Sequence, residues 1–372
     1  MNLKMWSVVA AIIIILSASG MYFSNNMEDR DKAVIIGMVN EEGSGIFASN
    51  SVPGLSLDPS TADLWGGLVF ATPGPSSIQH MILMDFVIGV LGLKFAQNVA
   101  DKKSDTVYWT GVAPGTMGDA LSEGIIQGGI AWEAHYSNIC SPTNGYNAYS
   151  VGLTTDLWED HPCCVVAASR NFVGGDPNAI LRFLSAYSAS VLWVNEAIKT
   201  TSTNHSALIE YVKAKAGVTN ELVIQEALEN VVYTYSLEYL KNGIITMVET
   251  YQNLGLLSHT MEEMGFEDSG SFADWLIDDS YIKNAAGRAP SSYSVLTENI
   301  IINVGVLAND IHQIALHVGI GEGIFDQYGI TLNTGVPFAA GGPVMTALLS
   351  GQIDIGFVGS PPVVLTTVEM WW

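Results

Sequence analysis

Basic side chains are scarce in this chain, and the shortage excludes whole classes of partner. Its 372 residues hold 14 Lys and Arg against 37 Asp and Glu, which gives a formal net charge of −23 at pH 7. A protein that binds nucleic acid needs cationic side chains to neutralise phosphates, so this balance excludes a nucleic-acid partner. It also argues against docking on anionic lipid head groups. Solubility explains the acidity most simply, and a cationic ligand or a basic partner is the alternative.

Cysteine is equally scarce, with Cys140, Cys163 and Cys164 only. Two adjacent cysteines cannot easily bridge each other without strain, so a disulfide from Cys140 to one of the pair is the alternative to three free thiols. No Cys-x-x-Cys or Cys/His spacing indicates zinc, and nothing in the spacing of His135 and His161 requires a metal. We therefore expect neither a metal site nor a cofactor.

Catalytic motifs are also missing from the sequence. The chain contains no Gly-x-Ser-x-Gly elbow, no Walker loop and no His-Glu-x-x-His sequence. Those are the local patterns of common hydrolases, nucleotide-binding enzymes and metalloproteases. The plentiful carboxylates fall mostly on helical faces, as expected of a solvated surface. These observations favour a binding protein over an enzyme.

What the chain has is length and apolar content. A hydrophobic content of 48% with 14% charged residues is typical of an ordered globular protein, and the length suffices for two lobes. Residues 5–23 form an uncharged apolar run after Lys4, which predicts a signal peptide or a single membrane anchor. We exclude residues 1–28 from the fold. We expect the rest to be exported, with membrane association through this segment as one alternative.

The stretch at residues 341–362 predicts a place to hold a small ligand. It reads as loop, short helix, apolar strand, and then a Gly359-Ser360-Pro361-Pro362 turn that opens a second helix. Ser360 is expected as the N-cap, with Pro361 at the first helical position. A strand followed by a small-residue turn and a helix N-terminus suits an anion.

A second strand, turn and helix start lies earlier in the chain. Residues 69–72 predict a short strand, and Ser76 and Ser77 stand at the start of an apolar helix that runs to Leu91. Unpaired N–H groups and the positive end of the helix dipole again suit an anion, at about 0.3–1 kcal/mol each. Ordinary N-capping by either serine is the alternative. The Gly43-Ser44-Gly45 turn, after an expected strand at residues 33–39, fits either a ligand contact or a plain turn.

Two stretches share the same predicted order of secondary-structure elements, which indicates an internal duplication. "DALSEGIIQGGIAWEAHYS" at residues 119–137 and "TALLSGQIDIGFVGSPPVV" at residues 346–364 both read as helix, serine-containing turn, strand and loop. Two matching half-units suggest two lobes built from βαβ elements. In the first of them, Trp132 either walls a ligand site or packs in a core.

The strongest pattern resembles a known family. "ALLSGQIDIGFVGSPPVVL" at residues 347–365 resembles the signature of the nitrate/sulfonate/taurine family of ABC-transporter substrate-binding proteins. The resemblance implies an α/β, two-lobed periplasmic-binding-protein-like (type II) fold. Each lobe would be a mixed sheet flanked by helices, with the ligand in the interlobe cleft. It also implies a small-molecule solute, with an ABC permease and ATPase as partner subunits.

The order of the pieces is unusual for that family. "GEGIFDQYGI" at residues 321–330 resembles a segment that normally comes first, so residues 300–372 resemble the family's N-terminal segment. A circular permutation, with the family's ends joined through residues 287–299, explains this order. It assigns residues 31–50 and 160–372 to lobe 1 and residues 51–159 to lobe 2. A truncated tandem array, or a segment swapped between chains, is the alternative.

The turns and the resemblance together select candidate ligand-binding residues. Hydroxyls and helix N-termini would bind an anionic head group, and Trp132 would pack on an organic part. The resulting hypothesis is an exported solute-binding protein for a sulfonate, taurine, nitrate or a similar solute. A thiamine-pyrimidine binding or biosynthesis protein, or a membrane-anchored sensor domain, is the alternative. The candidate residues are His312, Gln313, Gly342, Gly359, Ser360, Gly43, Ser44, Gly45, Ser76, Ser77, Trp132 and Glu133.

Overall fold

The computed structural model describes residues 32–293 and 299–371. The segment expected to be a signal peptide or anchor, residues 5–23, lies outside the described residues, as does part of the expected linker at residues 287–299. In the part of the chain that is described, no helix is long and apolar enough to cross a membrane.

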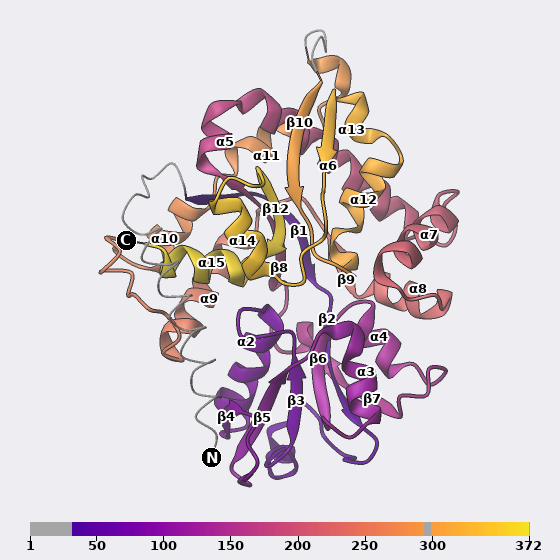
Figure 1. Ribbon diagram of the computed structural model, residues 1–372, viewed down its shortest axis with the longest axis vertical. Helices are drawn as coiled ribbons and strands as arrows, with labels where there is room; N and C mark the ends of the chain where they lie inside the picture. Colours follow the sequence, from indigo (N-terminus) through magenta and orange to yellow (C-terminus); the bar gives the residue numbers. More distant parts are fainter. Residues whose placement is uncertain (1–31, 294–298, 372) are drawn as a thin grey trace, which may run out of the picture.

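Two six-stranded mixed sheets form the two halves of the molecule (Figure 1). We call the half built on the first sheet lobe 1 and the other half lobe 2. In lobe 1 the strand order is β11 (Ile330–Asn333), β10 (Ile300–Gly305), β12 (Ile355–Gly359), β8 (Pro162–Ser169), β1 (Ala33–Glu42) and β9 (Val231–Tyr233). In lobe 2 the order is β4 (Lys94–Gln97), β5 (Thr106–Gly111), β3 (Val69–Thr72), β6 (Gly128–Trp132), β2 (Ser44–Ser49) and β7 (Ala148–Leu153). The predicted two-lobed α/β fold class is confirmed.

Helices flank both sheets. Those of lobe 2 are α2 (Ile78–Asp85), α3 (Pro114–Ser122) and α4 (His135–Cys140). Those of lobe 1 are α5 (Arg170–Gly175), α6 (Pro177–Ala197), α7 (His205–Ala216), α8 (Glu221–Glu229), α9 (Leu240–Asn253), α10 (Ser269–Leu276), α11 (Ser280–Ala285), α12 (Ile314–Gly321), α13 (Ile324–Gln327), α14 (Gly341–Leu349) and α15 (Ser360–Glu369). Short turns of helix are η2 (Pro59–Leu64), η3 (Phe86–Val90), η4 (Thr154–Asp156), η5 (Pro290–Ser292) and η6 (Ile311–Gln313).

Helix α6 illustrates how local sequence sets an element and its packing. The Asp176 side chain accepts a hydrogen bond from the backbone N–H of Ala179 at 3.0 Å, and Pro177 follows at the first helical position. An apolar stripe of this helix is buried against the first sheet, where Phe183 and Tyr187 pack around Phe357 of β12.

Strand β6 begins later than its apolar pattern predicts. Residues 125–131 read as one strand, but the strand starts at Gly128. The N–H groups of Ile125 and Ile126 instead donate to the carbonyl of Ala120, because Gly124 ends helix α3 in the left-handed region at φ +73°. Ile125 is left 54% exposed, which an apolar residue in a central strand would not be.

The chain crosses between the lobes twice, at neighbouring positions. The first crossing passes from β1 to β2 through Gly43, which has φ +83°, and the second passes from η4 to β8. Because Ser44 pairs with Trp132 in the second sheet, strand β2 belongs to lobe 2, although the sequence pattern assigned residues 31–50 to lobe 1. The N–H of Glu42 donates to the carbonyl of His161, which ties the two crossings together.

The C-terminal segment completes the first sheet within the same chain. Strand β12 pairs with β8 in antiparallel register, from Ile355 opposite Ala168 to Gly359 opposite Cys164, and β10 lies parallel to β12. The two ends of the described chain also meet, since the Lys32 ammonium lies 3.8 Å from the centroid of a Trp371 ring. This arrangement is what the permutation hypothesis requires, and the hypothesis itself stays a prediction.

Candidate functional site

A cavity of about 180 Å³ lies between the lobes. Lobe 2 contributes the starts of α2 and α3 and the end of β6, and lobe 1 contributes the start of β8, the loop before η6, and the starts of α14 and α15. Of the sequence-predicted site residues, those that line it are Ser76, Ser77, Trp132, His312 and Gly359. Residues 163–164, Asp310 and Gly341 also line it.

Four helix N-termini converge on this cavity. They belong to α2, α3, α14 and α15, and the N-cap residues of the last three are Ala113, Ala340 and Gly359. None of these three makes a side-chain capping bond. Each has proline in its first turn, Pro114 in α3, Pro343 in α14 and both Pro361 and Pro362 in α15, so each start offers fewer backbone N–H donors than an ordinary helix, although the helix dipole remains. Among the residues that line the cavity there is no Lys or Arg.

Ser77 is the N-cap that does use its side chain. Its hydroxyl accepts from the N–H of His80 at 3.2 Å and donates to the carbonyl of Gly74 at 2.8 Å. Ordinary N-capping, one of the two alternatives predicted for this serine, is confirmed, and the residue also lines the cavity, so a ligand contact stays a prediction. Trp132 likewise lies against the cavity, and its ring N–H points to the carbonyl of Asn309 in lobe 1 at 3.4 Å.

Ser360 differs from its predicted role. It is the first residue of α15 rather than its N-cap, and its buried hydroxyl donates to the carbonyl of Pro162 at 2.8 Å. Since the side chain bonds β8, it does not line the cavity, and Gly359 holds the capping position instead.

Several other candidates serve the scaffold instead of lining the cavity. Glu133 accepts from the Ser137 and Asn230 side chains, at 2.8 Å in each case, and is fully buried. Burial raises the pKa of Glu133, while these hydrogen bonds act to lower it. Gln313 bonds Leu307, Asp310 and Phe357 at the base of η6, and Gly342 lies just past the lining residue Gly341.

The Gly43-Ser44-Gly45 turn forms the first crossing and lies outside the cavity lining. The Gly43 carbonyl accepts from the Nε2–H of His312 at 3.0 Å and from the N–H of Glu133 at 2.9 Å. Ser44 accepts from the Gln79 amide, and Gly45 lies against the Tyr136 ring, which a Cβ would meet at 2.4 Å. The turn therefore orients residues of both lobes around the cavity.

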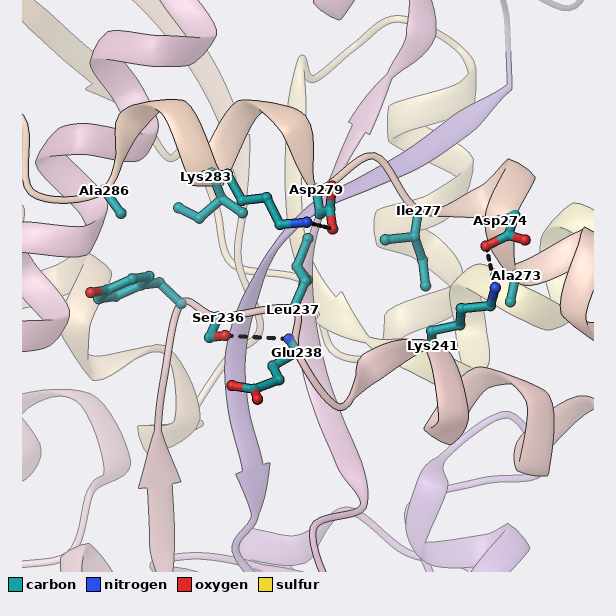
Figure 2. Close-up of a pocket in the computed structure, with 12 residues that line it drawn as sticks. Ser236, Leu237, Glu238, Lys241, Ala273, Asp274, Ile277, Asp279, Lys283 and Ala286 are labelled. Carbon is teal, nitrogen blue, oxygen red and sulfur yellow. Dashed lines mark hydrogen bonds and ion pairs between the residues drawn. The ribbon is translucent and has the colours of Figure 1, made fainter.

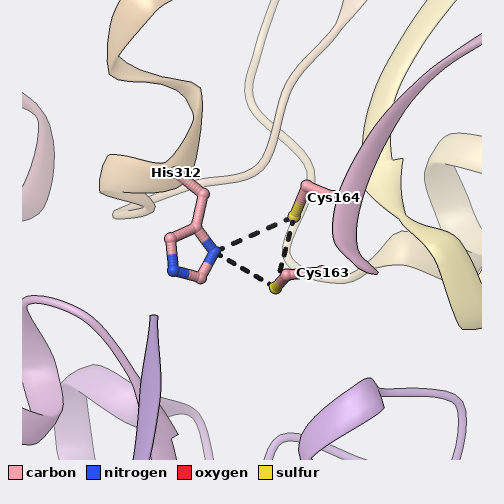
Figure 3. Close-up of side chains that lie close together, drawn as sticks. All are labelled: Cys163, Cys164 and His312. Atoms are coloured by element: carbon pink, nitrogen blue, oxygen red, sulfur yellow. Dashed lines mark hydrogen bonds between the residues drawn. The ribbon is translucent and has the colours of Figure 1, made fainter. Parts of the chain in front are cut away.

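Two thiols and an imidazole meet at the lobe 1 wall (Figure 3). The Nδ1 atom of His312 lies 3.5 Å from Sγ of Cys163 and 3.8 Å from Sγ of Cys164, and the two sulfur atoms are 3.9 Å apart. All three side chains are buried, and all three line the cavity. The expected alternative of a disulfide from Cys140 is wrong, because all three cysteines are free.

Charge is concentrated in this cluster. Burial by itself lowers the pKa of His312, but the Cys163 thiolate, the Asp310 carboxylate and the Gly43 carbonyl together raise it to about 10. The hydrogen bond with Cys164 lowers the pKa of Cys163, and the His312 charge lowers it further. The same bond raises the pKa of Cys164. The cluster thus favours one thiolate beside an imidazolium.

The histidine pair considered from the sequence does not form a site. The Nε2 atom of His135 pairs with the carbonyl of Asn309 at 2.9 Å, and that of His161 pairs with the Thr154 hydroxyl at 2.8 Å. The partners of His312 are instead two cysteines that lie 149 and 148 residues away along the chain. A search for local Cys/His spacing misses this cluster, because the cysteines lie on β8 and His312 follows β10, and the sheet order β10-β12-β8 brings these distant segments to the same side of the lobe.

A larger cavity, about 670 Å³, opens on lobe 1 alone (Figure 2). Its two lysines are already paired, Lys241 with Asp274 and Lys283 with Asp279, as the dashed lines in Figure 2 show. The site between the lobes is smaller, but it combines polar groups from both halves.

Comparison with known proteins gives a family and a fold. A family model described as NMT1-like family matches residues 8–211, more than half of the chain. The periplasmic nitrate-binding protein NrtA from Synechocystis PCC 6803 has a TM-score of 0.53 at 14% identity, covering 68% of this chain and 66% of that one. At this identity the similarity shows a shared fold. No curated protein matches the chain.

Two other solved structures are similar at lower TM-scores. The ligand-binding component of an ABC-type import system from Staphylococcus aureus, with zinc bound, has a TM-score of 0.48 at 14% identity and covers 68% of this chain and 74% of its own. The alkanesulfonate-binding protein SsuA from Xanthomonas axonopodis pv. citri, bound to MOPS, has a TM-score of 0.46 at 12% identity, with 67% and 74% covered. Neither carries an argument for this chain.

Proposed function

Because this chain belongs to the NMT1-like family, we propose that it is an exported solute-binding protein that delivers a small anionic solute to an ABC importer. The observation that carries the proposal is the convergence of four helix N-termini on one interlobe cavity. Backbone N–H groups and helix dipoles stabilise negative charge without any Lys or Arg. Solute binding, and no catalysis, is the proposed activity.

The size of the cavity limits the solute. Its volume of about 180 Å³ corresponds to roughly six water molecules at their share of liquid volume. Nitrate, bicarbonate or the head group of a sulfonate is of that scale. A longer organic tail would extend beyond this volume, and opening of the lobes about the two crossings, at Gly43 and at residues 157–161, would give it more room.

A thermal-shift screen tests the proposed function. Nitrate, bicarbonate, taurine, short alkanesulfonates and thiamine-type pyrimidines would each be added to the protein without its first 28 residues. An anion that binds only the folded state raises the melting temperature with concentration. If a pyrimidine alone stabilises the protein, the thiamine-pyrimidine alternative replaces the anion proposal, and if no compound does so, solute binding loses its support.

A pair of glycine variants tests whether the solute binds in this cavity. Gly111 lines it and has nothing within 4 Å of the position of a Cβ, so Gly111→Val adds bulk to the cavity from a position where the Cβ itself meets no atom. Gly174, in α5, is equally unobstructed and lies outside the cavity lining. We expect Gly111→Val to weaken solute binding at least tenfold, whereas Gly174→Val leaves it unchanged. Equal affinities in the two variants would move the solute away from this cavity.

The export proposal rests on residues 5–23, and a separate measurement addresses it. The mature protein from its native host, or from a bacterial host with an intact export pathway, would be sequenced from its N-terminus. A start between about residues 20 and 28 supports cleavage and release. An intact start with the protein in the membrane fraction supports the anchored alternative, and an intact start in the cytosolic fraction contradicts export.

A further inference from the structure

The two cysteines and the histidine at the lobe 1 wall are set out as metal ligands. We propose that Cys163, Cys164 and His312 (Figure 3) bind one Zn²⁺ ion, whose fourth coordination position opens into the interlobe cavity. Two thiolates, one imidazole and one open position form a known type of zinc coordination. The occupation of that open position by the solute rests on the proposed solute-binding function, whereas zinc binding does not.

The distances between the donor atoms fit zinc closely. Tetrahedral zinc, with bonds of about 2.3 Å to sulfur and about 2.05 Å to nitrogen, separates two sulfurs by about 3.8 Å and a sulfur from a nitrogen by about 3.6 Å. The structure has 3.9 Å between the sulfurs and 3.5 and 3.8 Å from the sulfurs to Nδ1 of His312. The three donors are therefore already spaced around the position of an ion.

The histidine is also held in the orientation that a ligand needs. A carbonyl oxygen can only accept, so the 3.0 Å contact with Gly43 requires the Nε2 atom of His312 to donate. Nδ1 is then the nitrogen left to face the sulfur atoms. A backbone carbonyl bonded to the far ring nitrogen is the usual support of a metal-bound histidine. Zinc would take the place of the Nδ1 and thiol protons, which leave to solvent.

The surroundings give the site both protection and access. The three side chains are between 1% and 3% exposed, so thiolates bound there would be shielded from competing water and oxidants. All three nevertheless face the cavity that also receives Ser76, Ser77 and Trp132 from lobe 2. An anion that enters between the lobes would thus reach the ion from the side opposite the protein ligands.

Direct metal measurements test the zinc site. The protein would be purified with a non-thiol reductant, stripped with a chelator, and titrated with ZnCl₂ and separately with CoCl₂. We expect one ion per chain and the intense visible absorption of tetrahedral cobalt with thiolate ligands. Cys163→Ser and Cys164→Ser should each weaken zinc binding at least 100-fold. Cys140→Ser is the matched control, because Cys140 is a free cysteine of lobe 2, and it should bind zinc as the parent protein does.

The outcomes separate the zinc site from the solute proposal. Less than a tenth of an equivalent of zinc on fully reduced protein, or equal zinc affinity in all three serine variants, overturns the zinc site. If zinc binds but no anion in the screen raises the melting temperature, the solute function fails and the zinc site stands. If a stabilising anion leaves the cobalt spectrum unchanged, the open position does not contact the solute and that part of the inference is overturned.

Discussion

Gly43 is the residue at which the first crossing between the lobes passes beside His312. Its φ of +83° lies in the left-handed region, and a Cβ there would come within 2.6 Å of Nε2 of His312 and 2.8 Å of a Val231 methyl group. Any side chain at this position therefore lowers the stability of the folded state in two ways. The left-handed backbone is strained for an L-residue, and the Cβ would push aside the His312 imidazole, whose two ring nitrogens contact the Gly43 carbonyl and the cysteine sulfurs.

A matched pair of alanine variants separates those two costs. Gly67 has the same φ of +83° but only one atom within 4 Å of a Cβ, at 3.9 Å. We expect Gly67→Ala to lower the free energy of unfolding by about 1 kcal/mol and Gly43→Ala by about 3 kcal/mol. Denaturant unfolding measures both. Equal losses would mean that His312 moves aside freely and that its position is not fixed by the crossing.

Glu41 gives the protein a pH-dependent stability. Burial and the neighbouring charges of Asp160, Glu42 and Glu238 raise the pKa of Glu41 from 4.5 to about 7. The folded state thus keeps a proton that the unfolded state has already released, so stability falls as the pH rises from about 4.5 to about 7. Glu41→Gln should remove this loss and gain on the order of 2 kcal/mol over the parent at pH 8.

The measurement for Glu41 is denaturant unfolding of both proteins from pH 4 to pH 8. The difference between them should be flat below about pH 4.5, grow up to about pH 7 and be flat again above it. A difference that does not change across this range would show that the carboxyl group titrates normally.

At the scale of residues, the sequence predicts the type of binding site better than it predicts which residues line it. Ser76 and Ser77 were predicted from turn chemistry and do line the cavity, because a helix start is a local feature. Trp132, predicted from the layout of its half-unit, also lines the cavity at the end of β6. Ser360 was predicted from turn chemistry as well, but its hydroxyl points back to Pro162 of β8. Which way a hydroxyl turns depends on the neighbouring strand, and the sequence does not name that neighbour.

At the scale of elements, helix α2 depends on one capping serine. Ser77 accepts from the N–H of His80 and donates to the carbonyl of Gly74, whereas the adjacent Ser76 has no part in the cap. We expect Ser77→Ala to cost about 1 kcal/mol of unfolding free energy and Ser76→Ala less than about 0.5 kcal/mol. Thermal or denaturant unfolding compares them, and equal costs would contradict the assigned cap.

Local patterns predicted most elements because each depends on neighbouring residues. The strand at β3 was predicted at its observed position, residues 69–72. The predicted start of β6 was wrong by three residues, because Gly124 ends α3 and the N–H groups of the next two residues bond in a turn, so this part of the apolar run does not join the strand. The cluster of Cys163, Cys164 and His312 had no local signal, because it forms only when β8 lies beside β12 and η6.

At the scale of the whole molecule, the unusual order of segments makes a prediction about connectivity. Strand β12 lies between β8 and β10 in the first sheet, so residues 299–371 supply half of the six strands of lobe 1. If the chain is a permutation of the family order, the two ends of the described chain should be joinable without changing the fold. The contact between Lys32 and Trp371 places those ends together.

A reordered chain tests this directly. It would begin at residue 299, run to residue 371, continue through a linker of about six Gly and Ser residues, and finish with residues 32–293. We expect a monomer with the parent's circular dichroism and a free energy of unfolding within about 1 kcal/mol of the parent. As a control, new ends placed inside α6 after Tyr187 should destabilise the protein severely, because that helix packs in the core of lobe 1. A reordered chain that folds only as an exchanged oligomer would favour the swapped or tandem alternative, since the segment would then need a second chain to complete the sheet.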